Sequence, residues 1–177
     1  MMSLSFTLYL FVFIFAAIGM TRGWAKEMLV TMSLFVAMLL IGFLQEYIPQ
    51  IKELPADSVN LLYLRVGALL TFAAVGYQTV RLSPLQVKLE RTHPYDALLG
   101  IVAGAINGYL IFGCVWFFMA QANYPFPEFI AAPVAGTVMG DSAAWWMKFL
   151  PPSWAFYSNP WLTAIVIVCC FVLLWII

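Results

Sequence analysis

The first 44 residues decide the fold class, because two apolar stretches, LSFTLYLFVFIFAAIGM (residues 4–20) and MLVTMSLFVAMLLIGFL (residues 28–44), flank the polar segment TRGWAKE (residues 21–27). A membrane-spanning helix needs about 17 to 25 mostly apolar residues, and each stretch reaches that length without a charge. The short connection predicts an antiparallel helical hairpin. The first stretch lacks the basic n-region of a signal peptide, so we interpret it as a retained anchor.

Three further apolar runs lie at residues 59–80, 97–120 and 161–177, which brings the predicted number of spanning helices to about five. The composition agrees with this interpretation. The 177 residues are 64% hydrophobic and 9% charged, whereas soluble domains contain about 25% charged residues. We therefore expect an all-α, polytopic membrane protein that forms a single integral membrane domain over residues 1–177.

The polar residues exclude several classes of function. The formal net charge is zero, which gives no indication of nucleic-acid binding. Cys114, Cys169 and Cys170 all lie in apolar runs without metal-ligand spacing, so we expect no metal site. His93 is the only histidine, and we favour a structural role at the interface over axial ligation of haem or a pigment. Without a nucleophile–base pair or paired carboxylates, we expect no enzyme and no cofactor.

Basic residues predict the orientation, because they are enriched in cytoplasmic loops. Five of them flank the runs on one side: Arg22, Lys26, Arg81, Lys88 and Arg91. Lys52 and Lys148 lie on the other. The N-terminus is therefore expected outside and, with five crossings, the C-terminus inside.

Two connecting segments have helical patterns of their own. Residues 83–91 predict a short helix in the cytoplasmic interface, with Ser83 as N-cap and Pro84 at its first position. Residues 121–160 form a long apolar loop rich in proline and tryptophan, expected on the outer membrane surface. Within it, residues 141–150 predict a helix capped by Asp141 and ended by Pro151.

Three glycines at four-residue spacing, Gly100, Gly104 and Gly108, mark the fourth run. Small residues let helix backbones approach closely in a membrane, so this glycine zipper predicts a helix contact. Its partner is either the second or third helix of the same chain, which we favour, or the same helix of another copy. Asn107, in the same stretch, is expected to form an interhelical hydrogen bond, the alternative being a functional polar site.

Arg65 is the one charge well inside an apolar run. The favoured interpretation is a structural arginine paired with Glu46, Glu53 or Asp57, and the alternative is an anion or proton site. No carboxylate is expected deep enough in a helix to form a proton relay with Arg65, which argues against a coupled transporter.

The hairpin residues form a G-x-x-R-G-x-x-x-E pattern at Gly19, Arg22, Gly23 and Glu27. Gly23 allows the positive φ that ends a helix, while Arg22 and Glu27 complement the helix dipoles on either side of it. These roles describe a capped turn, and a dedicated binding role is the alternative.

The same pattern resembles the signature of the colicin V production protein (CvpA) family of bacterial inner-membrane proteins. A second element agrees, since Asp96 to Gly100 resembles the D-R-x-L-G of that family, with Ala97 in place of the arginine. The resemblance implies a bacterial inner-membrane location and a part in toxin production or export and envelope function.

We therefore expect a non-enzymatic accessory or scaffold protein whose partners are the lipid bilayer and either a membrane protein or further copies of the chain. Two alternatives stay open. One is a small oligomeric channel or transporter, and the other is an accessory subunit of a larger bioenergetic or light-harvesting complex.

Overall fold

The computed structural model describes residues 3–79, 95–130, 132–156, 164 and 168, and within them it is helical without strands. Among the described residues, four helices are long and apolar enough to cross a membrane: α1 (Leu4–Arg22), α2 (Trp24–Tyr47), α4 (Val59–Thr79) and α6 (Tyr95–Gln121). The predicted all-α, polytopic fold is confirmed. The predicted fifth crossing (161–177), the interfacial helix at residues 83–91 and His93 lie outside the described residues, apart from 164 and 168.

Most of these helices extend beyond the apolar runs that predicted them. α2 begins at Trp24 rather than at Met28, and α6 begins at Tyr95 and ends at Gln121. Lys26 and Glu27 are good helix formers, so α2 includes them although they lie outside the apolar run. The short helix α3 (Pro49–Lys52) follows α2, with its proline at the first position.

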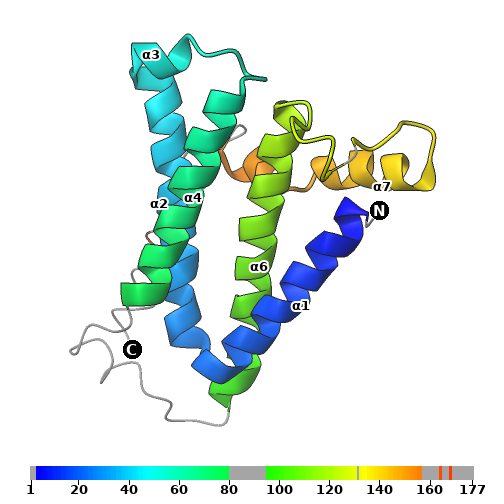
Figure 1. Cartoon of the computed structure of the whole chain (residues 1–177). Helices are drawn as coiled ribbons and strands as arrows, with labels where there is room; N and C mark the ends of the chain where they lie inside the picture. The colour runs from blue at the N-terminus through cyan, green and yellow to red at the C-terminus, as the bar shows by residue number, and fades with distance from the viewer. Residues whose placement is uncertain (1–2, 80–94, 131, 157–163, 165–167, 169–177) are drawn as a thin grey trace.

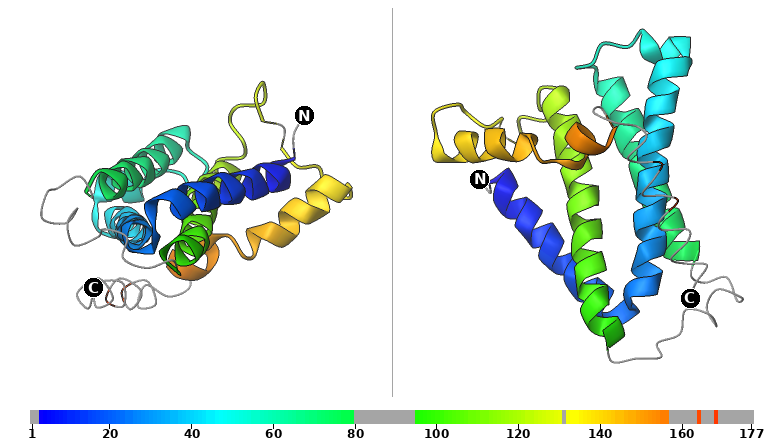
Figure 2. Two further views of the ribbon diagram at one scale, coloured as in Figure 1. Left: turned by 90° about the horizontal axis from the view of Figure 1, so that it is seen from below. Right: turned by 180° about the vertical axis from the view of Figure 1, so that it is seen from behind.

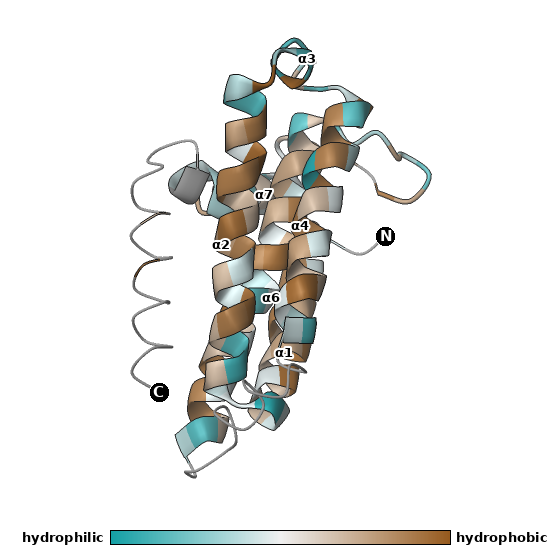
Figure 3. Ribbon diagram, turned by 90° about the vertical axis from the view of Figure 1, so that its left-hand side faces the viewer, coloured by the Kyte–Doolittle hydropathy of each residue, from teal (hydrophilic) through white to brown (hydrophobic). Residues whose placement is uncertain are grey.

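The long helices form a bundle with one divergent member (Figure 1). α2 packs against α4 and α6, and α1 packs mainly on α6. Figure 2 shows that α1 meets α6 near the hairpin and diverges from it toward the N-terminus. The hydropathy colouring in Figure 3 is mostly hydrophobic along the helices, with hydrophilic residues mainly toward their ends.

The glycines of α6 pack against the backbone of α1. A Cβ built on Gly104 would overlap the carbonyl oxygen of Phe15 and lie 3.0 Å from Cα of Gly19. At Gly108 a Cβ would lie 2.7 Å from the carbonyl oxygen of Phe11. The contact is within the chain, as favoured, but its partner is α1 rather than the second or third helix.

In the described part of the chain up to residue 156, two short elements follow α6: α7 (Val138–Met147) and a single π-helical turn, η1 (Pro152–Phe156). α7 begins before the predicted position, and its N-cap is Thr137 rather than Asp141. The Thr137 hydroxyl accepts a hydrogen bond from the Gly140 backbone N–H at 3.0 Å. Gly136, with φ of 79°, turns the chain just before this cap, which allows the earlier start.

Candidate functional site

The turn between α1 and α2 is made at Gly23, which belongs to neither helix. Its φ of 88° and ψ of 157° are confined almost entirely to glycine. The Gly23 backbone N–H donates to the Gly19 carbonyl at 2.9 Å and so ends α1. Arg22 is thereby placed in the last turn of α1, and Glu27 in the first turn of α2.

Replacing Gly23 by alanine is expected to cost about 1–3 kcal/mol of stability, because the added Cβ disfavours this backbone conformation. Gly67→Ala is the matched control. Gly67 lies inside α4 with open space where a Cβ would stand, so alanine there should stabilise by about 0.5–1 kcal/mol. Thermal unfolding of the purified variants in detergent measures both effects. Equal changes in stability for Gly23→Ala and Gly67→Ala would contradict the role given to Gly23 in the turn.

The carboxylate of Glu27 is completely buried, although it lies only one turn from the hairpin. Its oxygen Oε2 accepts hydrogen bonds from Asn107 Nδ2 at 2.8 Å and from the Tyr77 hydroxyl at 3.3 Å. Its other oxygen, Oε1, is 3.4 Å from Nη1 of Arg22. A buried carboxylate is costly unless it is paired and hydrogen-bonded. Asn107 and Tyr77 supply the hydrogen bonds at Oε2, whereas Oε1 has the charge of Arg22 beside it but forms no hydrogen bond.

Asn107 is held from both ends of its amide. Its Nδ2 also donates to the Glu27 backbone carbonyl at 3.0 Å, and its Oδ1 accepts from the Thr31 hydroxyl at 2.7 Å. Because Thr31 lies one turn after Glu27, both side chains occupy the same face of α2. The interhelical hydrogen bond expected of Asn107 is therefore present, and it joins α6 to α2.

Arg22 covers Glu27 and Tyr77 on their outer side. Its guanidinium carbon lies 4.3 Å from the centre of the Tyr77 ring, and its side chain is 20% exposed. All four long helices therefore converge on Glu27, through Arg22 of α1, Tyr77 of α4 and Asn107 of α6. We refer to Arg22, Glu27, Thr31, Tyr77 and Asn107 as the hairpin cluster.

A further hydrogen bond fixes the start of α6 beside the hairpin. Trp24 Nε1 donates to Asp96 Oδ1 at 3.1 Å. Gly19, Gly100 and Gly104 lie within the same contact, since a Cβ on Gly19 would overlap the backbone of Gly100. The two sequence elements that pointed to one family are thus adjacent in the structure.

The sequence model of the family described as "Colicin V production protein" matches residues 4–143, which include both elements and the four long helices. The chain belongs to this family. Comparison with curated proteins and with solved structures found no match. The chain is thus a multi-pass membrane protein of the colicin V production family, and its hairpin cluster lies within the matched region.

A second polar cluster surrounds Arg65 at the opposite end of the bundle. Arg65 is buried, and its guanidinium donates to Oε1 of Gln45, through Nε at 3.0 Å, and to Oε1 of Gln121 at 2.7 Å. The side chain also lies over the ring of Phe118. We refer to Arg65, Gln45 and Gln121 as the arginine cluster.

The expected acidic partners of Arg65 are replaced by amides. Glu46 instead accepts from Lys52 at 3.2 Å at the surface. The helical period explains the difference, because Gln45 and Glu46 point in directions about 100° apart on α2 and only one of them can face α4.

The sequence did not predict that a carboxylate near the hairpin would be buried. Glu27 is a buried carboxylate, although it is remote from Arg65. Tyr77, which contacts Glu27, is twelve residues from Arg65 along α4, about 18 Å at 1.5 Å per residue. The two clusters therefore do not form a relay with each other.

Proposed function

We propose that this chain is a non-enzymatic accessory or scaffold protein of the bacterial inner membrane, which acts through contacts with other membrane proteins in toxin production or export and in envelope function. The observation that carries the proposal is the separation of its two polar clusters by an apolar core. Family membership supports the toxin and envelope context.

The layer between the clusters is filled by apolar side chains of α2, α4 and α6. The members that are at most 2% exposed are Val30, Leu34, Ala37, Met38, Ile41, Leu69, Leu110 and Cys114. Close-packed apolar side chains leave little room for ordered water, which needs polar partners. A path for ions or polar solutes through one copy of the bundle would have to cross this layer. This packing favours the scaffold over the channel or transporter.

The exposed surface of α1 supports a role in contacts. In the 18-residue apolar stretch of α1, 11% of the residues are buried, compared with 56% in the corresponding stretches of α2 and α6. The open side carries large side chains, with Phe13 72% exposed and Tyr9 and Phe6 also exposed. The side of α1 that does not face α6 is therefore available for contact with a partner helix.

A photo-crosslinking amino acid at Phe13 tests this role in cells. We expect a discrete protein adduct at Phe13 and none at Val75, which is also exposed but lies on α4. Mass spectrometry of the adduct purified in mild detergent would identify the partner, or a second copy of this chain. Lipid adducts alone at both positions would contradict the proposed role of α1.

The proposed orientation places the hairpin in the cytoplasm and the α2–α4 connection outside. A cysteine at Asp57 should react with a membrane-impermeant thiol reagent in cells whose outer membrane is permeabilised, and a cysteine at Thr21 should be protected until the inner membrane is opened. Both side chains are exposed, so accessibility within the fold does not separate them. Labelling of Thr21→Cys and protection of Asp57→Cys would reverse the orientation.

A further inference from the structure

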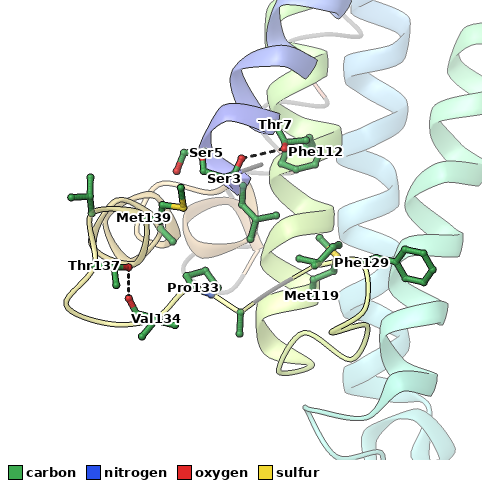
Figure 4. Close-up of a pocket in the computed structure, with 15 residues that line it drawn as sticks. Ser3, Ser5, Thr7, Phe112, Met119, Phe129, Pro133, Val134, Thr137 and Met139 are labelled. Atoms are coloured by element: carbon green, nitrogen blue, oxygen red, sulfur yellow. Dashed lines mark hydrogen bonds between the residues drawn. The ribbon is translucent and has the colours of Figure 1, made fainter. Parts of the chain in front are cut away.

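A pocket of about 660 Å³ lies between the start of α1, the second half of α6 and the segment leading into α7 (Figure 4). α1 and α6 touch at their glycines near the hairpin and diverge toward this end of the bundle. The pocket occupies part of the space left by that divergence. Its volume is within the range of about 300–1,000 Å³ that is usual for small-molecule sites.

The side chains that line the pocket are either apolar or hydroxyls that have a hydrogen-bond partner within the protein. None of its fifteen lining residues is charged. The Thr7 hydroxyl donates to the Ser3 carbonyl, and the Thr137 hydroxyl donates to the Val134 carbonyl. The Ser3 hydroxyl accepts from the Phe6 backbone, and the Ser5 hydroxyl bonds that of Ser142. With its hydroxyls occupied in this way, the pocket is suited to a ligand that makes few polar contacts.

Contacts between α7 and α1 hold the pocket in shape. The hydroxyls of Ser5 and Ser142 are 2.8 Å apart. The rings of Tyr9 and Trp146 meet edge to face with their centres 5.7 Å apart. Because these contacts join α7 to the start of α1, the protein's own side chains define the pocket.

We infer that this pocket holds an acyl chain of a bilayer phospholipid. An apolar cavity does not bind water, and helices that span the membrane bring this one beside lipid. The exposed side chains at its margin are also apolar, with Phe129 82% and Val138 89% exposed. Such side chains are favourable next to acyl chains and unfavourable in water, so they indicate that the mouth of the pocket meets the bilayer.

A phospholipid with a diazirine at the end of one acyl chain tests the inference. The full chain is reconstituted in phosphatidylethanolamine–phosphatidylglycerol vesicles that contain this probe, and adducts are mapped after illumination. Met119 lines the pocket and is buried, whereas Phe43 is exposed on α2 and reports lipid around the protein. We expect adducts at Met119, and we express them as a ratio to adducts at Phe43.

Thr7→Phe should lower this ratio several-fold, because the larger side chain fills the pocket. Thr71→Phe is the matched control, since Thr71 is an exposed helical threonine whose hydroxyl also donates to a backbone carbonyl one turn earlier. If Thr7→Phe does not give a monodisperse protein, Ala132→Trp narrows the same pocket from the loop. No adducts at Met119, or an equal ratio in parent and pocket-filling variant, would overturn the inference. Preferential labelling of Met119 by a diazirine free fatty acid would overturn the assignment to a phospholipid.

Discussion

Gly104→Ala is expected to destabilise the protein by about 1–3 kcal/mol or more, because the new methyl group would overlap the carbonyl oxygen of Phe15. The overlapping atom belongs to the backbone, so a change of side-chain rotamer cannot relieve the clash. α1 must move away from α6, and that movement also loosens the hairpin, since Gly19 lies in the same contact. In a lipid environment no hydrophobic driving force restores the lost packing.

The free energy of unfolding in mixed detergent micelles measures this effect. Gly67→Ala provides the control, because it adds the same methyl group to a glycine inside a spanning helix where nothing lies within 4 Å. We expect the free energy of unfolding to fall for Gly104→Ala and to rise for Gly67→Ala. A neutral Gly104→Ala would mean that α1 and α6 do not touch at this glycine.

Arg22→Met is expected to have the second large effect, about 3 kcal/mol, because it leaves the buried Glu27 carboxylate without its cation. This value is at the lower end of the range of about 3–5 kcal/mol for broken buried pairs, since the Arg22 side chain is 20% exposed. Glu27→Gln alone should cost less, because it removes the buried charge and keeps an acceptor for Asn107.

The double variant distinguishes an ion pair from two unrelated contacts. With Glu27→Gln present, Arg22→Met no longer leaves a charge unpaired, so the double variant should be more stable than Arg22→Met alone. The free energies of unfolding of the parent, the two single variants and the double variant, measured under identical conditions, complete this double-mutant cycle. Strict additivity of the two costs would show that Arg22 and Glu27 do not interact energetically.

The four spanning helices could be predicted from the sequence because long uncharged runs have few other uses. Their ends could not, since polar residues such as Lys26 and Glu27 continue α2 into the interface. The helix that packs against the α6 glycines could not be predicted either. Glycine spacing identifies a surface that can be approached closely but does not name its partner. α1 contributes one small residue, Gly19, and otherwise meets α6 through the backbone at Phe11 and Phe15, two bulky residues that show no small-residue pattern.

The hairpin cluster could be predicted in part. Gly19, Arg22, Gly23 and Glu27 stood out as a pattern and Asn107 as a polar residue in an apolar run, but nothing in the sequence joined them. Tyr77 carried no signal, because a tyrosine near the end of a spanning helix is typical of the membrane interface. Thr31 could have been found, since it lies four residues after Glu27 on the same helical face.

The proposed function requires that apolar packing between the hairpin cluster and the arginine cluster closes the bundle to ions. Proton flux into vesicles that contain the purified protein, followed with an enclosed pH-sensitive dye after a pH gradient is imposed, tests this closure. We expect the gradient to decay no faster than in vesicles without protein. Faster decay that Asn107→Leu abolishes, in a variant that remains folded, would contradict it.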